Sequence, residues 1–303
     1  MLSTHSQLVD SFEESQSSIS ESKLIREILK YISYNSCVLF DYDNTLGEPT
    51  HVAATDEMFE MLFQFASLAM NNQIALNIVV MISRAFHYHT DMLPVEKSKT
   101  TQILKILNDI NIPTLLVTLR GIDLMGCTEQ QLDRMKLQFS DFWPRGTFKL
   151  DVGTPIKPVI YSNGKLFCNG HSKAECIKSF FNYIQYQPKN VTMLDDKVHH
   201  LSKSKKMFTE DFHCEFHGVH YRHLDEKVAY FKENFDLHAV VPDLKDDILH
   251  LKSKHDDISL CALRAIDRYS LTVLNKKSLF KDKKHLKETE KMELNHSVCQ
   301  IKM

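Results

Sequence analysis

The chain has 303 residues, of which 43% are apolar and 25% charged, a composition that argues against wholesale disorder and against collagen-like or other fibrous classes. Lys and Arg number 37 and Asp and Glu number 39, so the charge balance gives no electrostatic reason to expect nucleic acid as a partner. No apolar run reaches the roughly 18–20 residues that a bilayer-crossing helix needs, so the sequence predicts no membrane span.

The first elements predicted are a flexible lead-in, a short helix and a buried strand. Residues 1–22 are rich in Ser and Glu and are expected to form a flexible N-terminal segment, and residues 23–32 have a helical pattern. The apolar run Cys37–Phe40 then ends abruptly in the polar sequence Asp41–Thr45. A short apolar run bounded by polar turn residues is typical of a fully buried strand in a parallel sheet.

A helical insertion is predicted over residues 47–112. Apolar residues recur there at helical spacing, for example at Met58, Met61, Leu62 and Phe65, which share one helix face. The insertion is placed so that it could act as a cap over a site. Its apolar makeup leaves open whether it is a mobile cap or simply packs on the core.

A second buried strand and a hairpin follow the insertion. Thr114–Thr118 is an apolar run introduced by Pro113. Thr128 and Gln131 have the spacing of a capping box that would open a helix. Two short apolar runs flank the pair Asn163-Gly164, which is a strong β-hairpin signal.

The remaining elements continue an alternation of strands and helices. Ser172 and Glu175 have capping-box spacing before a helix, and the strand Val191–Leu194 runs straight into Asp195-Asp196. A strand at 216–221 and a helix at 225–235 follow. This alternation between residues 37 and 235 predicts an α/β fold with a mainly parallel sheet.

The domain boundaries follow from these patterns. Residues 23–46 and 113–240 are expected to form the core, 241–275 a C-terminal helical extension, and 276–303 a charged tail that is disordered. Seven scattered cysteines without metal-ligand spacing, and an N-terminus without the apolar segment of a secretory signal, predict a cytoplasmic protein with reduced thiols. Export as an effector without a cleavable signal peptide, directed by the tail, stays open as an alternative.

Polar side chains follow several of the predicted strands at the point where each strand ends. They are Asp41 and Asp43 after the first strand, Thr118 after the second, and Asp195 and Asp196 after a later one. Because ligands bind at the carboxyl ends of strands in open α/β sheets, these side chains are expected to converge. Gathered carboxylates repel one another unless a cation neutralises them, and oxygen ligands with open positions suit Mg²⁺. The sequence therefore predicts a magnesium site.

These residues resemble the four motifs of the haloacid dehalogenase (HAD) superfamily of phosphohydrolases. An apolar strand followed by D-x-D-x-T is matched by Asp41–Thr45, the strand-ending Thr by Thr118, the Lys near a helix start by Lys173, and the acidic strand end by Asp195-Asp196. They come in the family's order within residues 37–197, about half the chain. The resemblance implies a HAD-like, Rossmannoid three-layer sandwich with a cap-like insertion.

A narrower resemblance is to an uncharacterised bacterial branch, domain of unknown function 2608. It is based on Thr118-Leu119-Arg120, the Asn-Gly hairpin that leads to Lys173, Asp195-Asp196-Lys197 and the strand Phe216–Tyr221.

The HAD resemblance implies a role for each matched residue. Asp41 would be the nucleophile that forms an aspartyl-phosphate, and Asp43 the general acid and base. Thr118 would hydrogen-bond a phosphoryl oxygen, and Lys173 would offset the negative charge of the transition state. Thr45, Leu119 and Arg120 would join Thr118 and Lys173 in binding substrate.

The same resemblance implies the magnesium ligands: the carboxylate of Asp41, the backbone carbonyl of Asp43 and an acid from the pair Asp195 and Asp196, with Asp195 preferred.

The function that these features predict is a Mg²⁺-dependent phosphatase acting on a phosphorylated substrate whose identity the sequence does not give. One alternative is a HAD-fold binding or effector protein, secreted by a bacterium, that acts through a host or bacterial protein partner with little or no hydrolase activity. A further alternative is a phosphotransferase or mutase that uses the same residues.

Overall fold

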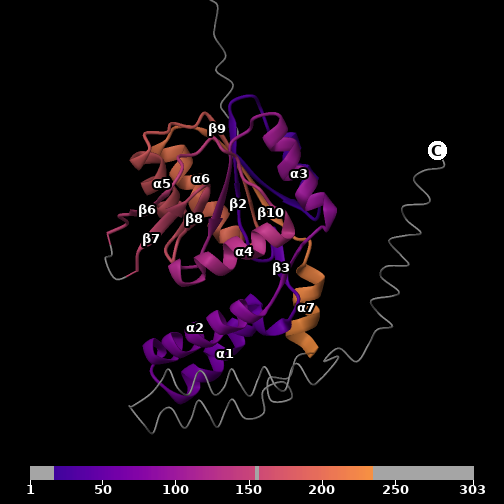
Figure 1. Ribbon diagram of the computed structural model, residues 1–303, viewed down its shortest axis with the longest axis vertical. Coiled ribbons are helices and arrows are strands. Elements are labelled where there is room, and N and C mark those ends of the chain that lie inside the picture. Colours follow the sequence, from indigo (N-terminus) through magenta and orange to yellow (C-terminus); the bar gives the residue numbers. More distant parts are fainter. Residues whose placement is uncertain (1–16, 154–156, 235–303) are drawn as a thin grey trace, which may run out of the picture. The chain divides into compact units, whose positions relative to one another are not determined.

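An eight-stranded sheet is the centre of the computed structural model, which describes residues 17–153 and 157–234 (Figure 1). Its strand order is β1-β10-β9-β2-β5-β8-β7-β6. In this order, every pair of neighbours from β1 as far as β8 is parallel, whereas the pairs β8-β7 and β7-β6 are antiparallel. The strands are β1 (Ser18–Ser22), β2 (Ser36–Phe40), β5 (Thr114–Thr118), β6 (Thr147–Leu150), β7 (Val159–Ser162), β8 (Lys165–Phe167), β9 (Asn190–Asp195) and β10 (Glu215–Tyr221).

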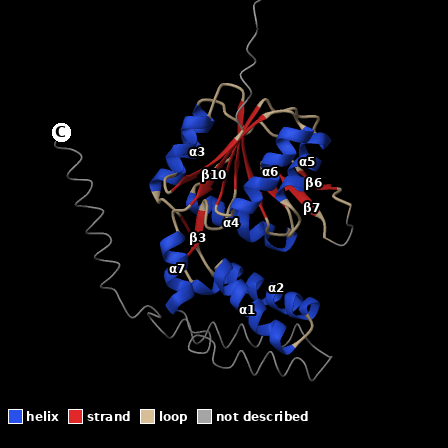
Figure 2. Cartoon of the chain, turned by 180° about the vertical axis from the view of Figure 1, so that it is seen from behind, coloured by secondary structure: helices blue, strands red, loops and turns tan. Residues whose placement is uncertain are grey.

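Helices cover both faces of this sheet (Figure 2). The helices of the described residues are α1 (Asp56–Ala69), α2 (Asn72–His89), α3 (Ser98–Asp109), α4 (Met125–Met135), α5 (Lys173–Tyr183), α6 (Val198–Asp211) and α7 (Asp225–Asn234), with short 3-10 helices η1 (Ile25–Tyr31), η2 (Val52–Ala54) and η3 (Ile122–Leu124). Those that pack on the sheet are α5 and α6 on one face and η1, α3 and α4 on the other.

The central strands are buried on both sides because their side chains alternate between two cores. Leu39 of β2 belongs to the core formed with helices α5 and α6, whereas its neighbours Val38 and Phe40 belong to the core formed with η1, α3 and α4. The predicted α/β class and mainly parallel sheet are therefore confirmed, and the sheet with its two helical faces makes three layers.

Both edges of the sheet differ from what the sequence pattern predicted. Ser18–Ser22 was expected to be part of a flexible lead-in, but it forms β1, which pairs in parallel with β10. An edge strand with one polar face lacks the apolar run that marks a central strand, and here only Ile19 packs against the core. At the other edge, β6 was not predicted at all, and two of its residues, Thr147 and Lys149, are exposed.

The predicted insertion over residues 47–112 is not one structural unit. Its last helix, α3, packs Ile103, Leu104 and Leu107 into the same core as the central strands, so it is the crossover helix between β2 and β5. Within it, β3 (Gly47–Pro49) and β4 (Met92–Pro94) pair as a two-stranded antiparallel sheet. Residues 63–82, the end of α1 and the first part of α2, belong to a second compact unit.

The predictions made from turn and capping residues were partly correct. The hairpin between β7 and β8 has Asn163 at φ 44° and Gly164 at φ 78°, the positive angles that a tight hairpin turn requires. Ser172 is at the N-cap of α5, but its side chain makes no capping hydrogen bond. Thr128 is not a cap: it is buried inside α4, where its hydroxyl accepts a hydrogen bond from Arg120.

Five cysteines lie in the described part of the chain, and all of them are buried free thiols. None of the described helices has the length and apolar character needed to cross a bilayer. The predicted C-terminal extension, 241–275, and charged tail, 276–303, lie outside the described residues.

Candidate functional site

The candidate site lies at the carboxyl ends of three neighbouring strands, β9, β2 and β5. The chain leaves β2 and returns on one side as β5 and on the other as β9, so β2 is a topological switch point of the sheet. Such a point is where ligands bind in open α/β folds. Asp41 directly follows β2, Thr118 ends β5 and Asp195 ends β9, as the sequence predicted.

A buried ion triad joins two of these strand ends to helix α5. The ammonium of Lys173, at the first residue of α5, lies 2.5 Å from Asp41 Oδ1 and 2.6 Å from Asp195 Oδ2. All three side chains are at least nine-tenths buried. Asp195 Oδ1 also accepts a hydrogen bond of 2.9 Å from the backbone N–H of Lys197. The residues are 132 and 22 positions apart, and the fold brings them into direct contact.

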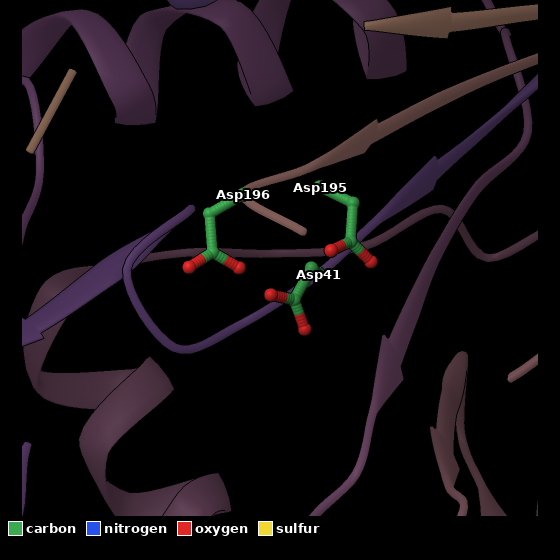
Figure 3. Close-up of side chains that lie close together, drawn as sticks. All are labelled: Asp41, Asp195 and Asp196. Atoms are coloured by element: carbon green, nitrogen blue, oxygen red, sulfur yellow. The ribbon is translucent and has the colours of Figure 1, made fainter. Parts of the chain in front are cut away.

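A third carboxylate completes the cluster (Figure 3). One oxygen each from Asp41, Asp195 and Asp196 lies within 4.8 Å of the others. Oxygen ligands around Mg²⁺ at 2.0–2.1 Å stand about 3 to 4 Å from one another, so these carboxylates have the chemistry for a magnesium ion and could share one after small movements of their side chains. Asp196 is the more open of the adjacent pair, with a side chain 13% exposed and one oxygen 3.1 Å from the Lys197 ammonium.

Burial and crowding shift the protonation of these groups. Burial raises the pKa of Asp195 to about 7, and burial together with the charge of Asp41 raises the pKa of Asp196 to about 8. For Lys173 burial alone would lower the pKa, but the charges of Asp195 and Asp41 outweigh it and raise the pKa instead. The lysine is therefore charged. The remaining repulsion among the carboxylates of Asp41, Asp195 and Asp196 is what a bound divalent cation would reduce.

The loop after Asp41 is tightly organised by its own backbone. The Tyr42 carbonyl accepts hydrogen bonds from the N–H groups of Thr45, Leu46 and Gly47. Asn44 has φ 59°, which this turn requires and which Asn tolerates. The Thr45 hydroxyl donates to Asp41 Oδ2 at 3.2 Å, and Thr45 has no exposed surface. Thr45 therefore orients the Asp41 carboxylate, a contact that the substrate-binding role implied by resemblance did not include.

Asp43 does not join the Lys173 triad and instead pairs with Arg120. Arg120 Nε and Nη2 donate to the two oxygens of Asp43 at 2.9 and 2.6 Å. Burial alone would raise the pKa of Asp43, but the charge and hydrogen bonds of Arg120 outweigh it and hold the pKa below its usual value. Arg120 was predicted to bind substrate, yet its side chain is only 3% exposed.

Several residues that contact Arg120 had not been predicted to belong to the site. Its Nη1 donates to Thr128 at 3.0 Å and Gln131 at 2.8 Å, its Nη2 lies 3.1 Å from His87 Nδ1, and its guanidinium stacks 4.4 Å from the centre of the Tyr42 ring. Thr128 and Gln131 did stand out in the sequence, but as a capping box. Nothing in the local pattern distinguished His87.

Thr118 and Leu119 are placed differently from each other. The Thr118 hydroxyl, which is buried, accepts a 3.1 Å hydrogen bond from the backbone N–H of Arg120 and so shapes the turn after β5. The Leu119 side chain is 40% exposed, and its carbonyl accepts a hydrogen bond from Gly170. No contact given by the structure joins either side chain to the aspartate cluster, so their predicted substrate contacts stay predictions.

A further acid, at the start of α1, borders the cluster. Asp56 Oδ2 lies 4.0 Å from the Lys197 ammonium, which also pairs with Asp196. Burial, followed by the charges of Asp43 and Asp196, raises the pKa of Asp56. Lys197 thus links Asp196, the second acid of the predicted metal pair, to Asp56, which no sequence motif had indicated.

Comparison with known proteins gives a family match and a distant structural similarity. A family model described as "Protein of unknown function (DUF2608)" matches residues 19–248. Among solved structures, a haloacid dehalogenase-like family hydrolase from Streptococcus pneumoniae is 13% identical, with a TM-score of 0.38, covering 66% of this chain and 100% of that chain. Comparison with curated proteins gives no match. The family match runs from within β1 to beyond α7.

Proposed function

Since the chain belongs to the protein family of unknown function DUF2608, whose description names no activity, we propose its function from the site: it is a magnesium-dependent phosphohydrolase that attacks phosphate esters with the carboxylate of Asp41. The observation that carries the proposal is the contact of the Lys173 ammonium with Asp41 and Asp195, beside Asp196, at the switch point of the sheet. The order of these residues along the chain resembles that of HAD phosphohydrolases.

The first step assigned to the site is nucleophilic attack. Thr45 and Lys173 hold the two oxygens of Asp41 at 3.2 and 2.5 Å, which orients the carboxylate toward a phosphoryl group. Attack forms an aspartyl-phosphate and expels the alcohol, which takes a proton from Asp43. Asp43 has to enter this step protonated, although Arg120 lowers its pKa. Water then attacks the phosphorus, Asp43 recovers a proton, and phosphate leaves. Lys173 offsets the added negative charge in both steps.

Magnesium would be held by the carboxylates of Asp41, Asp195 and Asp196 and the backbone carbonyl of Asp43. When bound, the ion supplies charge stabilisation of the phosphoryl oxygens and a template that aligns them with the nucleophile. The three carboxylates have the chemistry for such an ion, and one oxygen of each lies within 4.8 Å of the others. Asp195 would share its oxygens with Lys173 and the Lys197 N–H, which leaves Asp196 the more available of the two.

The proposal is tested by phosphate release from a panel of phosphorylated metabolites, nucleotides, phosphopeptides and an aryl phosphate. The purified full chain is expected to release phosphate from the aryl ester in Mg²⁺ and to stop when the ion is chelated. Adding a small alcohol distinguishes hydrolysis from phosphotransfer, since a transferase would pass the phosphoryl group to the alcohol. Absence of turnover together with absence of Mg²⁺ binding by calorimetry would contradict the proposal, and Mg²⁺ binding without turnover would favour a binding protein.

Magnesium binding is expected to stabilise the fold more at pH 8 than at pH 6. The unfolded pKa of an aspartate is about 3.9, whereas in the fold Asp195 and Asp196 titrate at about 7 and about 8. The metal-free fold therefore retains protons that the unfolded chain has released, and it loses stability as the pH rises from 4 to 8. Mg²⁺ needs the deprotonated acids, so its affinity should be at least about tenfold higher at pH 8.

This pH dependence is measured by thermal unfolding and calorimetry at the two pH values, with and without Mg²⁺. Asp196→Asn is the matched variant, because it removes one of the two competing protons and should flatten the dependence. Equal stabilisation at pH 6 and pH 8 would show that protons and the cation do not compete for these acids.

A further inference from the structure

We propose that Arg120 is a positioning residue for the phosphoryl-transfer reaction: it holds the Asp43 carboxylate in one orientation and does not bind the substrate. This inference rests on the proposed function, in which Asp43 exchanges the proton with the leaving group and with water. It changes the role of Arg120, which resemblance had assigned to substrate binding.

The first argument is the geometry of the pair. Two nitrogens of one guanidinium edge, Nε and Nη2, contact the two oxygens of Asp43 at 2.9 and 2.6 Å. A planar fork that grips both oxygens fixes the rotation of the carboxylate as well as its position, which a single ammonium does not do. Asp43 keeps 22% of its side chain exposed and Arg120 only 3%, so solvent reaches the pair from the Asp43 side.

The second argument is that Arg120 has no donor left for a phosphoryl oxygen. A guanidinium has five N–H groups and no acceptor. Two are used by Asp43, two more by Thr128 at 3.0 Å and Gln131 at 2.8 Å, and the fifth points to His87 Nδ1 at 3.1 Å. With 3% of the side chain exposed, the substrate would have to displace one of these partners to reach it.

The third argument is that the partners of Arg120 are themselves held in place. Because arginine can only donate, His87 Nδ1 must accept, and burial followed by the charge of Arg120 lowers the pKa of His87 to about 3, which keeps the imidazole neutral. Gln131 Nε2 donates to the carbonyls of His87 and Thr90 at 3.1 and 3.0 Å, which turns its Oε1 toward Arg120. A fully satisfied network of this kind is rigid.

The network also reaches the nucleophile loop from a second direction. The Tyr42 ring, between Asp41 and Asp43 in the chain, lies 4.4 Å from the Arg120 guanidinium carbon, and its hydroxyl donates to Gln131 at 3.2 Å. Arg120 therefore contacts both the side chain of Tyr42, the residue before Asp43, and the Asp43 carboxylate itself, as expected of a group that supports the acid.

The test compares two substrates that share a phosphoryl group and differ in their leaving group, a nitrophenyl phosphate and an alkyl phosphate. A nitrophenolate leaves without help from an acid, whereas an alkoxide needs a proton. Arg120→Met and Arg120→Lys are expected to lower kcat for the alkyl ester by about 10²-fold and for the aryl ester by less than about tenfold, with KM little changed. Arg134→Met is the control, because Arg134 pairs with Asp91 in an exposed position.

A double-mutant cycle separates action through Asp43 from any other role. Asp43→Asn should show the same leaving-group selectivity as Arg120→Met, and the double variant should be little worse than Asp43→Asn alone, because the two residues act as one unit. Equal losses for both esters in Arg120→Met, or a rise in KM shared by both, would overturn the proposal. Additive losses in the double variant would do so as well.

A structural measurement decides the question without relying on turnover or on a variant that must fold. Wild-type crystals are soaked with Mg²⁺ and beryllium trifluoride, a mimic of a phosphoryl group on a carboxylate. Arg120 is expected to remain on Asp43 and outside hydrogen-bonding distance of the mimic, and an Arg120 that moves onto the mimic would refute the positioning role. Failure of the mimic to bind Asp41, or inactivity of the wild type, counts against the proposed function, while the Arg120 contacts are still read from the same map.

Discussion

Asp41→Asn is expected to abolish phosphate release, lowering kcat by at least about 10⁴-fold. The amide that replaces the carboxylate is not a nucleophile, so no aspartyl-phosphate can form. The side chain keeps nearly the same volume, and the Thr45 hydroxyl can still find an oxygen at position 41. The loss should therefore appear in kcat, as measured by steady-state phosphate release, while thermal unfolding of the same sample reports the separate effect of removing the negative charge from its contact with Lys173.

The covalent intermediate provides an independent check on Asp41. Acid quenching during turnover of a labelled substrate should trap a protein-bound phosphate that hydroxylamine releases, and Asp41→Asn should trap none. Asp211→Asn is the control, because Asp211 is a partly exposed acid paired with Lys178. An Asp41→Asn variant with a rate within about tenfold of the wild type would rule out this nucleophile.

Lys173→Met is expected to destabilise the metal-free fold by roughly 3–5 kcal/mol, the cost of removing one partner from a buried ion pair. Asp41 Oδ1 and Asp195 Oδ2, now 2.5 and 2.6 Å from the ammonium, would be left facing each other and Asp196 without a cation. The effect should be smaller at pH 6 than at pH 8, because Asp195, whose pKa is about 7 even beside the lysine, takes up a proton at the lower pH.

Magnesium is expected to separate the structural role of Lys173 from its catalytic role. The cation can replace the missing positive charge, so saturating Mg²⁺ should restore much of the stability measured by urea unfolding. Catalysis should stay impaired, because the ammonium beside the phosphoryl group is still missing. Lys178→Met is the matched control on the same helix, since its ammonium is 44% exposed. Full recovery of turnover with Mg²⁺ would mean that Lys173 is needed only for folding.

The central strands could be predicted from the sequence because a strand buried on both faces is a continuous run of apolar residues. Thr114–Thr118 was predicted with the bounds that the structure has, and Val191–Leu194 lies within β9. A short, continuous apolar run between turn residues fits few structures other than a buried strand. The Asn163-Gly164 hairpin was similarly predictable, since its turn needs two positive φ angles.

The convergence of the site was also within reach of the sequence. Once Asp41 and Asp195 are assigned to the ends of parallel strands, the sheet must bring both to one edge. What could not be read from the pattern was the pairing within the site. Lys173 was expected to offset charge near the phosphoryl group, and the structure shows that it binds Asp41 and Asp195 directly.

The α/β class, the central strands and the acids at their ends could be predicted from the amino-acid sequence, because alternation, apolar runs and turn residues are local signals. The edge strand Ser18–Ser22, the packing of α3 on the sheet and the Arg120–Asp43 pair depend on contacts between distant segments and became visible only in the folded chain. The partner of a polar side chain depends on which segments the chain crossovers bring together. Arg120 and Asp43 are 77 residues apart, and no local pattern records that contact.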